Sequence, residues 1–137
     1  MLRFIGHNAF METILLVDDN PLRASVRRSA LARETSSVVR VLDASEALCT
    51  VETPEMIQTL GLVVTGHQMS GISGPEFVAE FRRRMPRVPV LVLSQIPSFE
   101  KEYQGIDGVY FSSSPSADEL RGLAEGLMEG MGRRQTA

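Results

Sequence analysis

Three short polar segments, each directly after an apolar run, contain the residues of this sequence that are best suited to chemistry. They are Asp18-Asp19-Asn20, the segment 66–71 and Ser94-Gln95. Two adjacent carboxylates repel a phosphate group, and their hard oxygen atoms suit Mg²⁺. Asp18 and Asp19 are therefore candidates for a weak Mg²⁺ site, and the residues suggest no other cofactor. The alternative is that one of them helps Asn20 to cap a helix while the other is solvated.

The first polar segment also bears on cofactor binding. A site that cradles phosphate needs glycines and backbone N–H groups directly after the first strand. This chain has two carboxylates there, which disfavours a small cofactor or nucleotide binder of flavodoxin-like fold. That function remains an alternative, which colour or nucleotide released on denaturation would reveal.

Five short apolar runs predict the strands that position these segments. Because the runs are continuous rather than alternating, each strand is expected to be buried on both faces, as in a parallel sheet. The runs are 13–17, 38–42, 62–65, 88–93 and 108–111.

Segments with helical spacing separate the runs. Asn20 and Pro21 predict the start of the first helix, as its N-cap and first residue. Its predicted core face consists of Leu22, Val26 and Ala30. Segments 45–56 and 98–104 predict two further helices, and two apolar stripes predict the rest. The stripes are Phe77, Val78, Phe81 and Met85, then Leu120, Leu123, Ala124, Leu127 and Met131.

A strand–helix unit repeated five times predicts the α/β class, with a doubly wound, five-stranded parallel sheet and helices on both faces. We expect an N-terminal extension at 1–11, a domain at 12–129 and a C-terminal tail at 130–137. Met11 could itself be the start, because the first predicted strand begins two residues later. Ligands of such sheets bind at the carboxyl ends of the strands, so the three polar segments are expected to meet at one edge.

Composition narrows the class of protein. The length of 137 residues fits one domain, and 14 Lys and Arg against 17 Asp and Glu give a formal net charge of −3. This balance argues against direct binding of nucleic acid. No run approaches the roughly 18 apolar residues of a membrane span, and residues 1–10 lack the apolar core of a secretory signal. The single cysteine, Cys49, cannot form an internal disulfide, which favours the cytoplasm.

Four blocks in order resemble the receiver domain of bacterial two-component response regulators, over about residues 13–128. They are Ile14-Leu15-Leu16-Val17-Asp18-Asp19-Asn20; 62–65 with Met69-Ser70-Gly71-Ile72-Ser73-Gly74-Pro75-Glu76; Pro89-Val90-Leu91-Val92-Leu93-Ser94; and Tyr110-Phe111 with Pro115. The resemblance implies a (βα)₅ fold and a role in a phosphorelay, in which a histidine kinase passes a phosphoryl group to an aspartate.

The sequence departs from that family at three positions, one of which is Ser70, where the family usually has a proline after the methionine of the third loop. The family's phosphoacceptor aspartate ends the third strand, where this chain has Gly66. The family's lysine precedes a proline after the fifth strand, where this chain has Ser114, and the only lysine is Lys101. In the family, phosphate draws a hydroxyl after the fourth strand inward, and an aromatic residue on the fifth strand follows. Besides the acidic pair, the resemblance therefore leaves Ser94 as the switch hydroxyl and Tyr110 or Phe111 as the switch aromatic.

These losses predict a pseudo-receiver that is not an enzyme. Glycine offers no nucleophile, and serine cannot replace the ammonium charge of lysine. We expect the chain to bind a signalling protein, namely a histidine kinase, a response regulator or an output protein, through its last two helices, which could also form a homodimer. The stripe Gly122, Gly126 and Gly130 fits such a surface, and equally fits a helix held by packing alone. No output domain is expected after Met128.

A receiver that still switches is the other alternative. Asp18, Asp19 or His67 would then accept the phosphoryl group, or a small ligand would take its place. A loop histidine is more often a solvated side chain, and His67 is expected to be one. Ser94 could bind an anion or simply end a strand.

Overall fold

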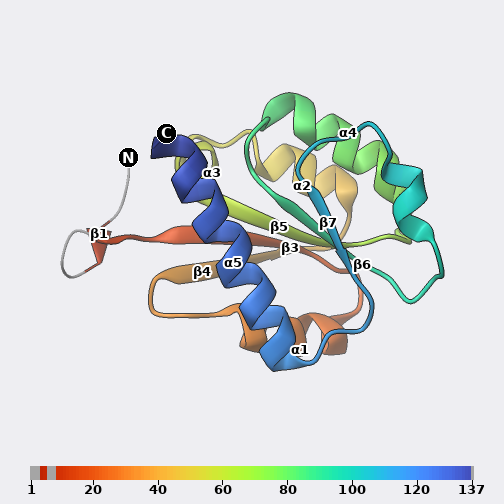
Figure 1. Ribbon diagram of the computed structural model, residues 1–137, viewed down its shortest axis with the longest axis horizontal. Coiled ribbons are helices and arrows are strands. Elements are labelled where there is room, and N and C mark those ends of the chain that lie inside the picture. The colour runs from red at the N-terminus through yellow and green to blue at the C-terminus, as the bar shows by residue number, and fades with distance from the viewer. Residues whose placement is uncertain (1–3, 6–8, 137) are drawn as a thin grey trace.

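Strands and helices alternate along the chain in the computed structural model, which describes residues 4–5 and 9–136 (Figure 1). A short antiparallel pair, β1 (Phe4–Ile5) and β2 (Ala9–Phe10), comes first. The strands of the main sheet are β3 (Glu12–Val17), β4 (Ser36–Val41), β5 (Leu60–Gly66), β6 (Val90–Leu93) and β7 (Val109–Ser112). The helices are α1 (Pro21–Leu31), α2 (Ala44–Thr50), α3 (Pro54–Thr59), α4 (Gly74–Arg84), α5 (Ala117–Thr136) and the 3₁₀ helix η1 (Phe99–Tyr103).

The five main strands form one parallel sheet in the order β4-β3-β5-β6-β7. All five predicted strands are present, and the predicted doubly wound fold is confirmed. The order reverses at β3, because the chain passes from β3 outwards to β4 and then returns to the other side of β3 as β5. Doubly wound sheets bind their ligands at such a point, and here Asp18 follows β3 while Gly66 ends β5.

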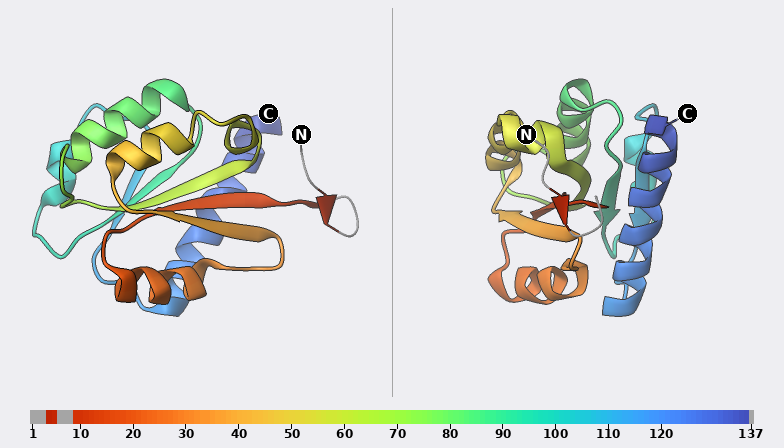
Figure 2. Two further views of the ribbon diagram at one scale, coloured as in Figure 1. Left: turned by 180° about the vertical axis from the view of Figure 1, so that it is seen from behind. Right: turned by 90° about the vertical axis from the view of Figure 1, so that its left-hand side faces the viewer.

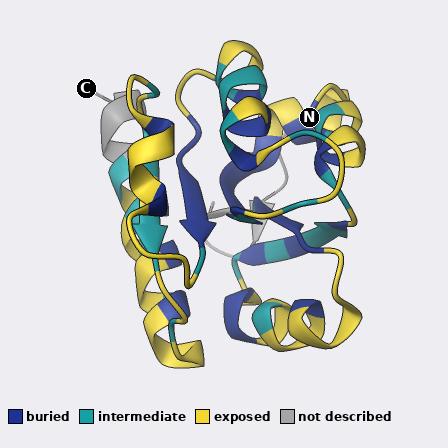
Figure 3. Ribbon diagram, turned by 90° about the vertical axis from the view of Figure 1, so that its right-hand side faces the viewer, coloured by how far each residue is buried: buried dark blue, intermediate teal, exposed yellow. Residues whose placement is uncertain are grey.

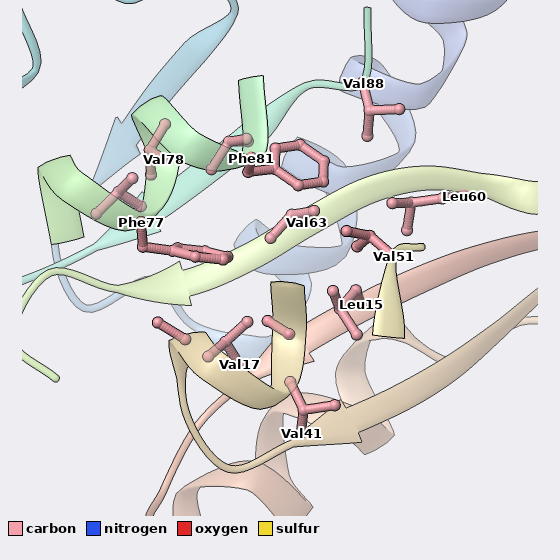
Figure 4. Close-up of a cluster of buried hydrophobic side chains, with 14 of the residues drawn as sticks. Leu15, Val17, Val41, Val51, Leu60, Val63, Phe77, Val78, Phe81 and Val88 are labelled. Carbon is pink, nitrogen blue, oxygen red and sulfur yellow. The ribbon is translucent and has the colours of Figure 1, made fainter. Parts of the chain in front are cut away.

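Helices cover both faces of the sheet and create two cores (Figure 2). Leu15 and Val63 point to the face under α2, α3 and α4, where they meet Phe77 and Phe81 (Figure 4). Ile14 and its strand neighbours on the opposite face pack under α1 and α5. The central strands β3, β5 and β6 are therefore buried, and the outer faces of the helices are exposed (Figure 3). Cover on both faces explains why the apolar runs of these strands do not alternate. The expected burial of every strand is wrong for β4 and β7, which are only partly buried because they lie at the edges of the sheet.

Side-chain caps fix where the helices next to the polar segments begin. The Asn20 side chain accepts a hydrogen bond from the Arg23 backbone N–H at 2.9 Å, and Pro21 is the first helical residue, as predicted. Ser73 and Glu76 form a capping box at α4, with each side chain bound to the other residue's backbone N–H. Both helices thus start directly after loops at the carboxyl edge of the sheet.

Three predicted segments differ from the structure. Residues 45–56 form two helices, because Pro54 cannot continue the preceding helix and instead begins α3 with Thr53 as N-cap. Residues 98–104 contain only the 3₁₀ helix η1. At the other end α5 continues to Thr136, so the segment 130–136 of the predicted tail is helical. Residues 1–3, 6–8 and 137 of the predicted extension and tail lie outside the described residues.

The predicted core face of α1 is confirmed at Ala30 and wrong at Leu22 and Val26. Leu22 is 81% and Val26 66% exposed, whereas Ala24, Ala30 and Leu31 are buried. The reason is electrostatic, because Arg23 and Arg27 turn toward Asp18 and this rotation carries Leu22 and Val26 outward. No helix within the described residues is long and apolar enough to cross a membrane.

Candidate functional site

Asp18 lies at the end of β3, and its carboxylate is shielded from solvent. Arg23 donates hydrogen bonds from Nε and Nη2 to both carboxylate oxygens at 2.8–3.1 Å, and Arg27 Nη1 donates to Oδ2 at 3.0 Å. The Asn20 backbone N–H adds a bond of 3.0 Å. Burial raises the pKa of Asp18, but the hydrogen bonds from Arg23 and Asn20 and the nearby charge of Arg27 outweigh it and hold the pKa below its usual value.

Three arginines converge on Asp18, two on its carboxylate and one on its backbone carbonyl. Arg23 and Arg27 lie one turn apart on α1, and Arg40 on β4 donates from Nε to the backbone carbonyl of Asp18 at 3.0 Å. The side chain of Arg27 is only 18% exposed. The sequence analysis did not single out these residues. Arg23 and Arg27 follow Asp18 in the first helix and are four residues apart, and this spacing was a usable signal because residues at i and i+4 lie on the same side of a helix.

Mg²⁺ does not fit the residues present. The two guanidinium groups occupy the carboxylate of Asp18, whereas Asp19 is mostly exposed and touches Arg23 Nη2 only at 3.4 Å. Within the described ranges, no group of three His, Cys, Asp or Glu residues could hold a metal ion. Hard cations need several oxygen ligands, so a metal would have to displace both arginines from Asp18.

Gly66 ends β5, the position that the resemblance assigns to the phosphoacceptor. A Cβ atom built there would meet only the Gln68 carbonyl oxygen, at 3.7 Å, which is ordinary van der Waals contact. Close packing therefore does not require glycine at position 66. The space that an aspartate would fill is open, and it forms part of a cavity.

That cavity has a volume of about 580 Å³ and opens at the carboxyl edge of the sheet. Ser94 and Ser114 line it together with Gly66, Arg23 and Arg27. The Ser94 hydroxyl accepts a hydrogen bond from the Ile96 backbone N–H at 3.1 Å, and the Ser114 hydroxyl accepts one from the Gln95 side-chain amide. Two of the three predicted polar segments thus line this cavity, and the first lies beside it through the hydrogen bonds of Asp18 to Arg23 and Arg27.

His67 is buried, so the expectation of a solvated side chain is wrong. Its Nδ1 lies 2.8 Å from the Tyr103 hydroxyl and its Nε2 lies 3.1 Å from a Glu102 carboxylate oxygen. Burial, and then the charge of Glu102, raise the pKa of Tyr103 well above its usual value, so Tyr103 remains a neutral hydroxyl. The short helix η1 is thereby tied across the loop that follows β5.

The two candidates for the switch aromatic have different surroundings. Phe111 packs against Phe99 and Tyr103, with ring centroids 5.5 and 5.4 Å away. Tyr110, the next residue on β7, is 37% exposed. Only Phe111 therefore joins the aromatic cluster that holds η1, and this cluster borders the cavity at His67.

Comparisons with known proteins agree with this architecture. The family model of the response regulator receiver domain matches residues 14–107. A search of curated proteins finds no match.

Solved structures with the same fold include three receiver proteins. The signal receiver domain of an HD domain-containing protein from Pseudomonas fluorescens Pf-5 has a TM-score of 0.79 at 18% identity, over 92% of this chain and 93% of that chain. A response regulator receiver protein from Sinorhizobium medicae WSM419 has a TM-score of 0.76 at 20% identity, over 88% and 97%. The chemotaxis response regulator CheY4 of Vibrio cholerae has a TM-score of 0.73 at 20% identity, over 85% and 98%.

The five-stranded parallel sheet matches the fold of these structures, and the family model covers more than half of the chain. The chain therefore belongs to the response regulator receiver domain family of two-component signalling.

Proposed function

We propose that this chain is a receiver domain that is not phosphorylated, has no enzymatic activity and acts by binding another signalling protein. The observation that carries the proposal is the pairing of Asp18 with Arg23 and Arg27, next to a β5 that ends in Gly66. Phosphoryl transfer to a carboxylate needs an in-line nucleophile, a metal and a cation for the transferring oxygens. Here the nucleophile position has no side chain, and the remaining carboxylate already binds two cations.

The contacts of His67 argue against its use as a substitute acceptor. Both ring nitrogens are engaged, one by the Tyr103 hydroxyl and the other by Glu102. A phosphoryl group on either nitrogen would have to break one of these contacts and enter a buried aromatic cluster. Among the alternatives, Asp19 is the exposed carboxylate, but a single exposed acid lacks the metal and the positioning that the reaction needs.

The surface formed by η1, β7 and α5 is our proposed partner face. β7 is an edge strand of the sheet, and Ile96, Tyr110 and Leu123 expose 37–38% of their surface on or next to these elements. Edge strands and exposed apolar side chains favour protein contacts. A histidine kinase, a response regulator or an output protein is the class of partner, and the cytoplasm is the proposed compartment.

A homodimer through α5 is a subsidiary proposal. A Cβ built on Gly122 or Gly126 meets no atom within 4 Å, so none of the residues that the structure describes packs closely against the stripe they form. A second copy could approach there.

Intact-mass measurement after treatment with acetyl phosphate and Mg²⁺ tests the loss of phosphorylation. We expect no phosphoryl adduct on the natural chain. The variant Gly66→Asp/Ser114→Lys/Arg23→Ala/Arg27→Ala is the positive control, because it restores both missing side chains, where a Cβ at position 66 is sterically allowed, and frees Asp18 for Mg²⁺. We expect it to gain an adduct, and we expect much less on Gly66→Asp/Ser114→Lys, in which both arginines still bind Asp18. A stoichiometric, acid-labile adduct on the natural chain would contradict the proposal, and mapping it would identify Asp18, Asp19 or His67 as acceptor.

A further inference from the structure

The cavity at the carboxyl edge of the sheet has a cationic wall. Of the side chains that line it within the described residues, Arg23 and Arg27 carry a full charge and none is a carboxylate. Asp18 lies beneath them with its side chain fully buried, so its charge is covered by the guanidinium groups. A solute that enters the cavity therefore meets the arginines and not the acid.

The arginines retain hydrogen-bond donors for such a solute. Arg23 uses Nε and Nη2, and Arg27 uses Nη1, to bind carboxylates. Arg23 Nη1 and Arg27 Nε and Nη2 pair with no acceptor among the described residues. With Arg40, three guanidinium groups stand around Asp18 and Asp19, which leaves the cluster with a net positive charge.

Neutral donors lie in the same wall. Ser94 and Ser114 each accept a hydrogen bond within the edge loops, from Ile96 N–H and the Gln95 amide respectively. Each hydroxyl proton is thereby left to donate to a ligand. Gly66 contributes open space, since a Cβ there would have a single neighbour at 3.7 Å.

An apolar recess between α1 and α5 adjoins the cavity. A second cavity of about 260 Å³ shares Arg23, Arg27, Gln95 and Ser114 with the first. The rest of its wall is mainly apolar and includes Val26, Ala30, Pro115 and Leu120. A ligand could thus place a charged head on the arginines and an apolar body beside Leu120.

We propose that this pocket binds a small organic anion, with an oxyanion head on Arg23 and Arg27 and its body in the recess between α1 and α5. Guanidinium groups bind planar and tetrahedral oxyanions through paired N–H donors, and the volume suits a small metabolite. The ligand binds without a covalent bond. The inference rests on the proposed function in one respect, because a phosphoryl group attached at this edge would fill the pocket.

Titration followed by ¹H–¹⁵N NMR tests the pocket, with phenyl phosphate and inorganic phosphate as probes at constant ionic strength. We expect saturable shifts at residues 66–68 and 94–96 with phenyl phosphate, with a Kd on the order of 1 mM or below, and weaker binding of inorganic phosphate. Shifts that do not saturate would overturn the proposal, as would inorganic phosphate that binds as tightly as phenyl phosphate.

Three variants sharpen the test. Arg27→Gln removes one donor set, and Gly66→Asp places a competing carboxylate in the pocket; each is expected to raise the Kd at least tenfold. Gly66→Asp leaves the ion pairs of Asp18 in place, so it remains informative if Arg27→Gln does not fold. Arg87→Gln removes the same charge at the opposite edge of the sheet, before β6, and should leave the Kd unchanged.

Unchanged binding in both pocket variants, or an equal loss in Arg87→Gln, would also refute the site. Failure of the proposed function is read separately, as a phosphoryl adduct on the natural chain by mass spectrometry.

Discussion

Asp18 is a buried carboxylate that two arginines of α1 neutralise. Its carboxylate binds Arg23 and Arg27 and has no exposed surface. A buried pair of this kind adds little when it is intact, but removing one partner leaves an uncompensated buried charge. The ion pairs therefore hold α1 in its rotation at the edge of the sheet, which makes Asp18 a structural residue.

Replacing Asp18 by Asn is expected to lower the free energy of unfolding by about 3 kcal/mol, because Arg27 would remain buried without its counter-charge. Asp19→Asn is the matched control. Its side chain is 58% exposed and its contact with Arg23 is long, so the change should stay below about 0.5 kcal/mol. Urea unfolding of the three proteins measures both values. A large loss in Asp19→Asn would show that this carboxylate has a binding role that the contacts do not reveal.

The same ion pairs predict how stability depends on pH. Because the folded pKa of Asp18 lies below its unfolded value, its contribution is present above the unfolded pKa, about 3.9. It is lost as the pH falls from there through the folded pKa. Burial raises the pKa of Glu12, which acts with the opposite sign. The difference in unfolding free energy between the natural chain and Asp18→Asn isolates the contribution of Asp18. This difference should shrink below about pH 4. A difference that is flat down to pH 2 would contradict the assignment.

At the scale of elements, η1 replaces the predicted fourth helix and is held by side chains, not by its own length. Phe99 and Tyr103 are buried, and the Tyr103 hydroxyl binds His67. Five residues of 3₁₀ helix have little intrinsic stability, so these contacts decide its order.

Tyr103→Phe should therefore speed amide hydrogen exchange across 98–104 and cost about 1–2 kcal/mol, because His67 Nδ1 loses its buried partner. Tyr110→Phe is the control, since its ring is partly exposed on the edge strand, and it should change exchange in this segment very little. Exchange that is equally slow in the natural chain and in Tyr103→Phe would show that the apolar contacts alone hold η1.

Two glycines in helices predict opposite effects of the same substitution. A Cβ on Gly74 would collide with the Tyr103 hydroxyl and lie 2.7 Å from the His67 carbonyl oxygen, so Gly74→Ala should destabilise the fold by about 2 kcal/mol. Gly126 has no neighbour within 4 Å, and Gly126→Ala should stabilise it by about 0.5–1 kcal/mol. Thermal unfolding measures both. If Gly126→Ala is destabilising and its effect grows with protein concentration, the stripe on α5 is a dimer contact.

At the scale of the whole molecule, the two cores and the covered sheet favour one conformation of the free chain. In a switching protein, a ligand must bind two states with different affinity. The Ser94 hydroxyl is bound to the loop by the Ile96 N–H, and Phe111 already packs in the aromatic cluster.

Ser94→Ala should consequently change the free energy of unfolding by less than about 1.5 kcal/mol and leave a single set of amide resonances in the absence of ligand. Two sets of peaks in the natural chain, with a ratio that shifts in Ser94→Ala, would demonstrate a switch that operates without phosphate.

Much of this protein follows from its sequence alone. Continuous apolar runs determined the five strands, and Asn20 with Pro21 determined where α1 begins, because these signals are local. The absence of a side chain at Gly66 and the single lysine are likewise properties of the sequence. They are sufficient to predict that the edge of the sheet lacks the usual phosphorylation chemistry.

Other features depended on contacts between distant residues. Leu22 and Val26 have helical spacing, but α1 turns them outward because Arg23 and Arg27 bind Asp18. His67 and Tyr103 are 36 residues apart in the chain, and only the folding of η1 over the loop after β5 brings them together. Periodicity identifies an apolar face, but the side that faces the core is decided by the total energy of packing and ion pairing, which exists only in the tertiary structure.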